Sequence, residues 1–385
     1  MKNKPKLTLN NIAHKITFDR VIRKEVTRKS HLWFFNIFLS HYLRYEFAPF
    51  HKEMFRLTEN AANKLLVVMA FRGSGKSTIL NLSYTLWSIL GIQQKKFVLI
   101  ISKTQDQAKN HFANIKTELE NNRLLSSDLG PFKAESDDRS SYSLELPNMG
   151  AKITSVPSRK SIRGMKHGFN RPDLIICDDI EDTLSMKDKE LESAIYEWFA
   201  NEVVTAGDNN TNIVIIGNLL GKNSLLVKLK QDIDEGRRKG IFKAYPLLDD
   251  NKKILWPGKY PNIESINRFK EKISDEIVWD REYLLRGREK FDLSPLTLFA
   301  EKSKESRESM KKESEEDCVK PYKIAGEEYQ ISAPILPMSL TEILNKIENQ
   351  KNLEKKELEN KENKEQNIEE IISEFKEIIR HPKEG

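Results

Sequence analysis

Apolar and polar positions follow a regular order between residues 65 and about 230 of the chain. Short, almost wholly apolar runs predict buried strands, and longer stretches with apolar residues every three or four positions predict amphipathic helices. The predicted strands are residues 65–70, 97–102, 174–177 and 213–217, the predicted helices are 78–90, 104–122 and 188–203, and 141–146 with 151–156 form a predicted hairpin. Strands that alternate with helices indicate an α/β fold, with a parallel sheet covered by helices.

The same pattern divides the chain into four parts. A basic, helical lead-in at residues 1–45 precedes the predicted core at 46–240. Residues 241–295 are predicted to form an appendage packed on the sheet, with a helical run near 263–286. Residues 296–385 are predicted to be a charged, low-complexity tail that is largely helical or disordered, because stretches of it consist of Lys, Glu and Asn.

Charge is unevenly distributed over these parts. The 385 residues are 38% hydrophobic, enough for a real core, and 32% charged, with a net charge of +6. Residues 301–385 carry 16 lysines and arginines against 21 acidic residues, so residues 1–300 carry 48 against 37 and have a net charge of +11. A basic body fits a polyanionic partner such as nucleic acid, although AT-rich coding also raises the lysine content.

The chain shows no pattern of a secreted or membrane-spanning protein. No segment reaches the about 18 apolar residues that a membrane span needs, and the first residues lack the apolar core of a signal peptide. Cys177 and Cys318 lie far apart, without metal-ligand spacing around either. We therefore expect a reduced protein in the cytoplasm, with no membrane partner.

A glycine-rich loop with the sequence Ala-Phe-Arg-Gly-Ser-Gly-Lys-Ser follows the first predicted strand and precedes a predicted helix. Gly73 and Gly75 allow the backbone to turn its N–H groups toward an anion, and the helix adds the positive end of its dipole. Lys76 would reach the β- and γ-phosphates, and Ser77 would ligate Mg²⁺. The predicted cofactors are ATP and Mg²⁺, and the predicted nucleotide-binding residues here are Ala70, Phe71, Arg72, Gly73, Ser74, Gly75, Lys76 and Ser77. Ala70 stands where the usual pattern has glycine.

A second motif supplies the carboxylates that such a loop needs. Asp178 closes the apolar run 174–177 and is placed to hold the metal, as a Walker-B aspartate does. The next residue usually positions or deprotonates the attacking water and is usually Glu, whereas here it is Asp179, one methylene shorter. Either Asp179 reaches the water or Glu181 substitutes for it, and the sequence leaves both open. Together the two motifs indicate a P-loop NTPase fold of the ASCE type.

Two further side chains are candidates for nucleotide contact. Asn218 follows the strand 213–217, at the edge where open parallel sheets bind ligands, and could sense the γ-phosphate. An ordinary turn explains it equally well. His51 precedes the first strand of the core and could contact the adenine base, or be a surface or packing histidine.

Arginines are the remaining electrostatic candidates. Arg72 within the loop and Arg163 in a flexible basic stretch could neutralise charge that develops on the γ-phosphate, in their own subunit or across an interface. Each could also be an ordinary surface charge. Lys160, Lys166 and Arg171 could equally hold a DNA phosphate backbone.

The motifs, in their order along the chain, resemble a known family. They are Arg-Gly-Ser-Gly-Lys-Ser at 72–77, Arg-Gly at 163–164, Asn-Arg-Pro-Asp-Leu-Ile-Ile at 170–176 and Asp-Asp-Ile-Glu at 178–181, with supporting matches at 48–51, 101–108, 255–257 and 281–283. This series is similar to the ATPase domain of the large terminase subunit of tailed bacteriophages, over about residues 40–290.

The resemblance implies an ATP-driven DNA-packaging motor. Such a motor forms a homo-oligomeric ring at the portal of an empty capsid in the cytoplasm of the bacterial host, and its partners are double-stranded DNA, the portal protein and the small terminase subunit. The family also carries an RNase-H-like nuclease, which uses clustered carboxylates. Residues 291–385 show no strand with an internal Asp, so we expect no nuclease activity in this chain.

Two alternative functions remain open from the sequence. Residues 101–108 also resemble the DNA-contacting turn of helicases, which favours a helicase-like DNA-dependent ATPase. The missing nuclease pattern also fits a truncated prophage remnant that binds nucleotide without packaging DNA.

Overall fold

The computed structural model describes residues 19–132, 142–181, 189–286, 321–324 and 327–330. The chain divides into two compact units, one of residues 30–291 and one of residues 1–29 with 292–385. The described elements of the second unit are helix α2 (Arg20–Lys29) and an antiparallel hairpin of β8 (Pro321–Ile324) and β9 (Glu327–Gln330), which the sequence analysis did not predict. The rest of the predicted tail lies outside the described residues.

The larger unit is built on a seven-stranded sheet with the order β3-β4-β2-β5-β6-β1-β7. All neighbouring strands are parallel except β3 and β4, which form the predicted hairpin. The strands are β1 (Leu65–Ala70), β2 (Phe97–Ser102), β3 (Ser143–Leu146), β4 (Ala151–Pro157), β5 (Leu174–Asp178), β6 (Asn212–Gly217) and β7 (Ile241–Tyr245).

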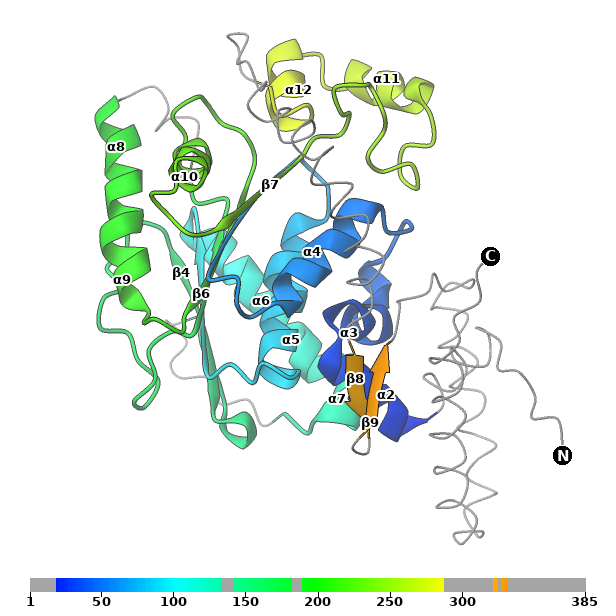
Figure 1. Cartoon of the computed structure of the whole chain (residues 1–385), viewed down its shortest axis with the longest axis vertical. Coiled ribbons are helices and arrows are strands. Elements are labelled where there is room, and N and C mark those ends of the chain that lie inside the picture. The colour runs from blue at the N-terminus through cyan, green and yellow to red at the C-terminus, as the bar shows by residue number, and fades with distance from the viewer. Residues whose placement is uncertain (1–18, 133–141, 182–188, 287–320, 325–326, 331–385) are drawn as a thin grey trace, which may run out of the picture. The chain divides into compact units, whose positions relative to one another are not determined.

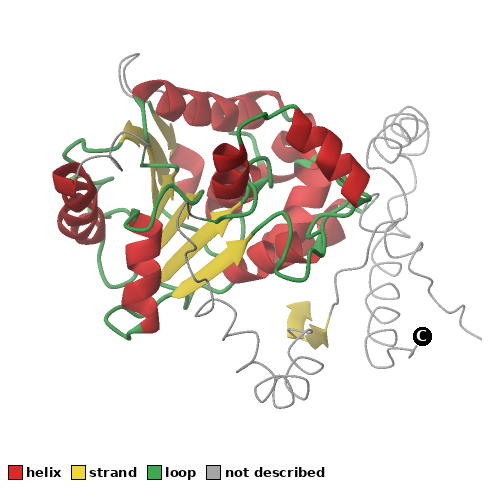
Figure 2. Ribbon diagram, turned by 90° about the horizontal axis from the view of Figure 1, so that it is seen from above, coloured by secondary structure: helices red, strands yellow, loops and turns green. Residues whose placement is uncertain are grey.

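Helices cover both faces of this sheet (Figures 1 and 2). On one face lie α8 (Lys189–Trp198), which continues through a π-helical turn (Phe199–Val203) into α9 (Val204–Ala206), and α10 (Leu225–Asp234). The other face is covered by helices that include α4 (Pro49–Glu59), α5 (Tyr84–Leu90) and α6 (Gln105–Asn121). The remaining helical elements are α3 (His31–Phe38), a 3-10 turn (Ser40–Tyr42), a π-helical turn (Thr78–Ser83), α7 (Arg123–Leu129), a 3-10 turn (Pro147–Met149), α11 (Ile263–Glu271) and α12 (Glu276–Glu282).

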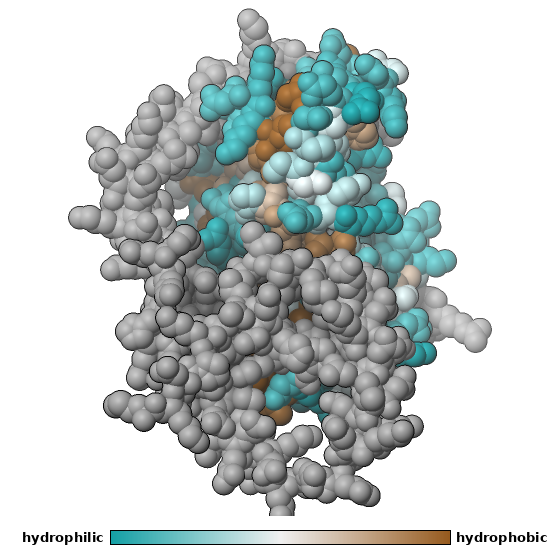
Figure 3. Space-filling model, turned by 90° about the vertical axis from the view of Figure 1, so that its right-hand side faces the viewer, coloured by the Kyte–Doolittle hydropathy of each residue, from teal (hydrophilic) through white to brown (hydrophobic). Residues whose placement is uncertain are grey.

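The strands are apolar along their whole length because both of their faces are buried. Leu65, Val67 and Met69 of β1 pack in one core cluster with Phe199 and with apolar side chains of α10. The alternate residues of β1 are equally buried on the opposite face. Unbroken apolar runs are typical of parallel strands between two helical layers. On the face drawn in Figure 3 the described surface is largely hydrophilic, with apolar residues in narrow strips.

The order of the strands brings distant motifs to one edge of the sheet. β6 lies between β1 and β5 and is parallel to both, with Met69 opposite Gly217 and Ile216 opposite Asp178. The glycine-rich loop after β1, Asp178 at the end of β5 and Asn218 after β6 therefore lie at the carboxyl ends of neighbouring strands, where open parallel sheets bind ligands. A strand between the loop strand and the acidic strand is the arrangement of the predicted ASCE-type P-loop NTPase fold.

The predicted boundary at residue 240 does not coincide with the edge of the sheet. β7 begins at Ile241 and pairs with β1, Val67 lying opposite Phe242. β7 is an edge strand in which most side chains are half-buried, so the alternation of apolar and polar residues along it is weak. The predicted helical run 263–286 is two helices, α11 and α12, and Asp275 caps the second. No helix among the described residues has the length and apolarity that a membrane crossing requires.

Candidate nucleotide-binding site

The glycine-rich loop follows β1 without a break. Ala70 is the last residue of that strand, lies opposite Tyr245 of β7 and is fully buried. Its extended backbone needs no glycine, which explains why alanine is tolerated at the first position of the loop. Gly73 and Gly75 have φ angles of 73° and 84°, in the left-handed region that favours glycine. The following helix starts at once, the N–H of Ile79 donating to the carbonyl of Gly75 at 3.0 Å.

Lys76 and Asn218 meet at the centre of the site. The Lys76 Nζ donates to Asn218 Oδ1 at 2.7 Å, and the lysine side chain is buried. The amide oxygen of Asn218 therefore holds the ammonium group at the edge of the sheet. The structure brings together the two residues that the sequence assigned to the γ-phosphate.

Asp178 lies directly beside Ser77. The hydroxyl of Ser77 donates to Asp178 Oδ1 at 3.1 Å, and the amide of Asn81 donates to Oδ2 at 3.0 Å. The Nε2 of His111, on α6, lies 3.6 Å from Oδ2. Asn81 and His111 were not among the predicted site residues. Asn81 could have been found because it lies four positions after Ser77 on the same helix face, whereas nothing local indicates His111.

This pair of oxygen ligands fits the predicted Mg²⁺. Mg²⁺ prefers oxygen donors and is usually bound by one or two protein groups together with substrate phosphates. Within the described residues, no group of three His, Cys, Asp or Glu side chains could hold a metal ion by itself. Ser77 and Asp178 are the residues that would hold Mg²⁺ together with a bound nucleotide.

Asp179 has an unusual backbone conformation that turns it into the site. Its φ is 49°, and its N–H donates to the carbonyl of Ile216 at 2.9 Å. Burial raises the pKa of the Asp179 carboxyl, as does the charge of Asp178, while Lys76 and His111 act in the opposite direction. A carboxylate with a raised pKa close to a lysine is suited to accept a proton from water.

Glu181 is engaged elsewhere. Its Oε1 accepts the N–H of Leu225 at 2.7 Å, and its side chain is buried. Leu225 is the first residue of α10, whose N-cap Ser224 makes no side-chain capping bond. The carboxylate of Glu181 thus satisfies a free N–H at a helix N-terminus, a favourable place for negative charge. Lys76 is among the charges that shift the pKa of Asp179, the other carboxylate that the sequence left open.

His51 lies beneath the glycine-rich loop. Its Nδ1 accepts the N–H of Ala48 at 3.0 Å, and its Nε2 donates to the carbonyl of Ser74 at 2.7 Å. The ring is buried and packs edge-on against Trp256, with ring centroids 4.5 Å apart. The expected contact with an adenine base is not supported by this placement, because both ring nitrogens bond within the protein.

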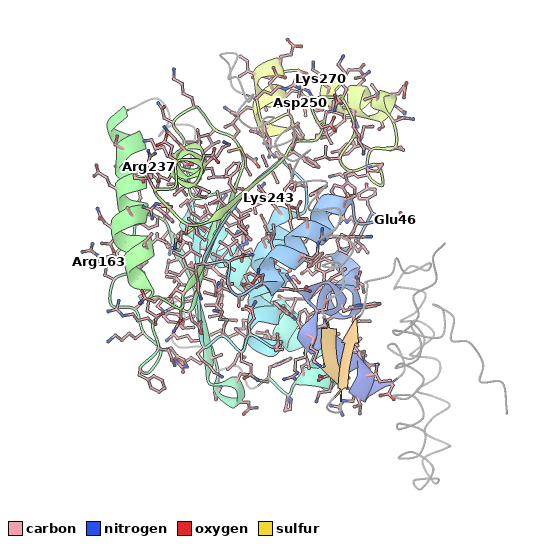
Figure 4. The ribbon with its side chains drawn as sticks, in the orientation of Figure 1. Glu46, Arg163, Arg237, Lys243, Asp250 and Lys270 are labelled. Carbon is pink, nitrogen blue, oxygen red and sulfur yellow. The ribbon has the colours of Figure 1, made fainter. Side chains whose placement is uncertain are left out.

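The two candidate arginines lie in different places. The backbone N–H of Arg72 donates to the carbonyl of Glu282 at 2.8 Å, and its guanidinium donates to the carboxylate of the same residue at 2.9 Å. Arg163 forms a salt bridge of 3.0 Å with Glu202 and donates to the carbonyl of Asn201, on the flank of the molecule beside α8 and α9 (Figure 4). Within one chain, only Arg72 is part of the site.

Residues 246–286 hold the loop from outside, which the sequence did not reveal. The Nζ of Lys259 donates to the carbonyl of Gly73 at 2.9 Å and lies 5.0 Å from the centre of the Trp256 ring. With Glu282 on Arg72 and Trp256 on His51, three contacts join this segment to the loop and its support. The segment therefore positions the P-loop as well as packing on the sheet.

No protein-family model and no curated protein sequence matches this chain. Solved structures do. The chain is similar in fold to the ATPase domains of phage large terminases. The large terminase of bacteriophage HK97 is 12% identical over 62% of this chain and 50% of its own, with a TM-score of 0.43. The large terminase ATPase domain of a Thermus phage is 16% identical over 66% of this chain and 97% of its own, with a TM-score of 0.42.

A DEAD-box helicase bound to single-stranded RNA and UDP-BeF is also similar, with 14% identity over 65% of this chain and 47% of its own and a TM-score of 0.37. The match spans about half the length of the HK97 terminase and of the helicase. At these identities the similarity concerns the fold alone.

Proposed function

We propose that this chain hydrolyses ATP and uses the energy to move double-stranded DNA, as the motor of phage or prophage DNA packaging. The observation that carries the ATPase part is that Asp178 and Asn218 meet Ser77 and Lys76 of the glycine-rich loop at one sheet edge. Asp178 and Asn218 lie more than a hundred residues after the loop in the sequence. A phosphate cradle, a lysine and a carboxylate beside a hydroxyl are the parts that bind a magnesium nucleotide.

Binding uses groups that are already in place. The N–H groups of the loop would cradle the β-phosphate, and Lys76 would pass from Asn218 to the γ-phosphate. Ser77 and Asp178 would hold Mg²⁺, which supplies positive charge to the phosphate oxygens. Asn218 keeps Lys76 at this position before a nucleotide arrives, so little reorganisation of the lysine is needed.

Hydrolysis adds water to the γ-phosphorus while the bond from phosphorus to the bridging oxygen breaks, giving ADP and phosphate. Asp179 would orient the water and take up its proton, and its raised pKa suits this task. Arg72 would stabilise the charge that develops on the transferred group. Glu181 would contribute indirectly, by holding the N-terminus of α10.

The packaging part of the proposal rests on the ordered motifs and on the basic body of the chain. Double-stranded DNA, the portal protein and the small terminase subunit would be the partners of a homo-oligomeric ring in the host cytoplasm. A basic surface attracts a polyanion irrespective of its sequence, as a DNA-translocating motor requires.

Phosphate release by the purified full-length chain tests the proposal. We expect release from ATP in the presence of Mg²⁺, a loss with a chelator, and stimulation by linear double-stranded DNA. Lys76→Ala should abolish release, whereas Lys239→Ala, which removes an exposed lysine outside the site, should not. Activity that survives Lys76→Ala would refute the assignment of the site.

The same assay separates the parts of the proposal. ATP hydrolysis that DNA does not stimulate would contradict the DNA motor and leave the ATPase in place. Tight ATP binding without any phosphate release would favour the nucleotide-binding remnant.

A further inference from the structure

A short, rigid hairpin turn precedes β5. His167 and Asn170 exchange both of their backbone hydrogen bonds, at 2.9 and 3.0 Å, which leaves Gly168 and Phe169 as the two turn residues. Gly168 has a φ of 58° and the φ of Phe169 is not positive, as in a type II′ hairpin turn with glycine as its first central residue. The Nδ1 of His167 lies 3.5 Å from the carboxylate of Glu145 on β3. The base of the turn is therefore tied to the sheet.

Phe169 projects from this turn into solvent. Its side chain is 93% exposed, and it is the only large hydrophobic residue of such exposure within the described stretch 142–181. A Cβ built on Gly168 would meet no atom within 4 Å, so the turn stands clear of its surroundings. An aromatic ring held in water by a fixed turn loses the free energy that burial would give it. Such a placement indicates a partner that covers the ring.

The stretch of chain that contains the ring is strongly basic. Residues 158–172 contain five lysines and arginines and no aspartate or glutamate. Arg163 pairs with Glu202, and Arg171 donates to the carbonyl of Thr205 at 3.2 Å. Among the described residues, no ion pair is formed by Arg159, Lys160 or Lys166, all of which are exposed. The partner that fits this segment carries negative charge.

The two properties together distinguish nucleic acid from a protein partner. A protein interface buries about 800 Å² on each side around an apolar centre, whereas here one ring stands on a two-residue turn. Proteins that bind nucleic acid combine cations on the phosphates with single aromatic rings that stack on bases or wedge between base steps. We infer that the turn 167–170 and its flanking cations contact nucleic acid, Phe169 lying against the bases and Lys166 against the phosphates.

The inference deepens the proposed function, since it names the surface that holds the DNA of the motor. The turn lies toward the amino ends of the parallel strands, because it directly precedes β5, whereas the P-loop lies at their carboxyl ends. Phe169 is therefore outside the catalytic machinery. A change at Phe169 should alter DNA binding and DNA stimulation and leave the basal ATPase rate unchanged.

Fluorescence anisotropy with a short labelled duplex, and with one of its strands alone, tests the inference on the full-length chain without nucleotide. Phe169→Ser should weaken binding about tenfold, which is the size of one lost stacking contact, and Phe169→Trp should retain it. Lys166→Gln should reduce the slope of log affinity against log salt by about 0.9, whereas Phe169→Ser should leave that slope unchanged. Ile263→Ser and Lys239→Gln, which alter an exposed apolar and an exposed charged residue elsewhere, are the matched controls.

Each outcome of this experiment either supports or overturns the inference. Preferential loss of duplex binding or of single-strand binding in Phe169→Ser supports the inference and identifies which form the ring contacts. Unchanged affinity in a Phe169→Ser protein with normal circular dichroism overturns it, as does a wild-type chain that binds neither oligonucleotide. A change of oligomeric state in sedimentation, with DNA binding intact, assigns the ring to a protein contact and also overturns it. Because no nucleotide is present, a chain without ATPase activity would refute the proposed function and leave this test valid.

Discussion

The imidazole of His51 donates from Nε2 to the carbonyl oxygen of Ser74, 2.7 Å away. A trans peptide points its carbonyl and its N–H in opposite directions, so this bond sets the direction of the Gly75 N–H, one of the groups that would face a phosphate. The N–H of Ala48 donates to the other ring nitrogen at 3.0 Å, which fixes the tautomer. A neutral ring thus links the start of α4 to the P-loop.

Two amide substitutions of His51, each of which reproduces one ring nitrogen, separate these roles. Glutamine places an amide donor near the position of Nε2 and can still bond Ser74, whereas asparagine places an oxygen near Nδ1 and can only bond Ala48. We expect His51→Asn to weaken ATP binding about tenfold, the loss of roughly one hydrogen bond that orients the loop, and His51→Gln to weaken it much less. Equilibrium binding of a fluorescent ATP analogue measures both.

Each of the two variants is the control for the other, since both remove the ring and its contact with Trp256. Equal losses in the two variants would mean that ring packing, and not the bond to Ser74, supports the loop. A larger loss of ATP affinity in His51→Gln than in His51→Asn would contradict the proposed role of the bond to Ser74.

His51 also predicts how stability depends on pH. Burial lowers its pKa from the usual 6.5 to about 4, and the charge of Lys259 acts in the same direction. Between these values the unfolded chain binds a proton at this ring that the folded chain does not. The free energy of unfolding should therefore be unaffected by this group above pH 6.5 and fall by about 3 kcal/mol as the pH drops to about 4.

Urea unfolding of the wild type and of His51→Gln at several pH values measures this contribution. The difference between the two proteins should shrink as the pH falls through this range, because glutamine does not titrate. His31, a buried histidine whose pKa is also lowered, is present in both proteins and cancels. A difference that is constant from pH 7 to pH 4 would show that His51 does not carry the effect.

The two carboxylates after β5 should behave differently when neutralised. Asp179→Asn should lower kcat by about 10³-fold with ATP affinity largely kept, since it removes the proposed acceptor of the proton from water. Glu181→Gln should stay active and stable, because its amide oxygen can still accept the N–H of Leu225. Glu181→Ala should lower the free energy of unfolding by about 2 kcal/mol, the cost of a lost buried bond to a charged group.

Steady-state phosphate release and urea unfolding check these outcomes. If Glu181→Gln lost turnover and Asp179→Asn stayed active, Glu181 and not Asp179 would be the residue that acts on the water.

Local patterns were enough to predict six of the seven strands of the sheet and the phosphate loop. The strands β1, β2, β5 and β6 are unbroken apolar runs, and such runs occur where both faces of a strand are covered. Gly75, Lys76 and Asp178 could be proposed from the sequence because a phosphate loop and its carboxylate require particular residue types next to a strand end. Ser77 and Asp178 lie together because β6 alone separates their strands.

Contacts between distant segments could not be predicted. The position of His51 depends on Trp256, which lies far along the chain and packs against its ring. The sequence therefore could not show whether His51 contacts an adenine base or supports the glycine-rich loop. The capping role of Glu181 depends on α10, which the periodicity did not reveal. Lys259 carries no motif, and only the folded chain places it on Gly73.

Arg72 and Arg163, which the sequence treated alike, should differ in a single-chain reaction. Arg72 extends from the P-loop and is held by Glu282, whereas Arg163 is paired with Glu202 on the flank of the molecule. Arg72→Gln should lower kcat by about 10³-fold if it stabilises the transferred phosphate, with little change in KM. Arg163→Gln should leave the basal rate of the dilute protein within about twofold of wild type, because an exposed ion pair contributes less than about 1 kcal/mol. Phosphate release measured over a range of protein concentrations tests both. A large defect in Arg163→Gln that grows with protein concentration would mean that this arginine acts on the site of a neighbouring subunit, and the basal activity would then belong to the ring and not to the single chain.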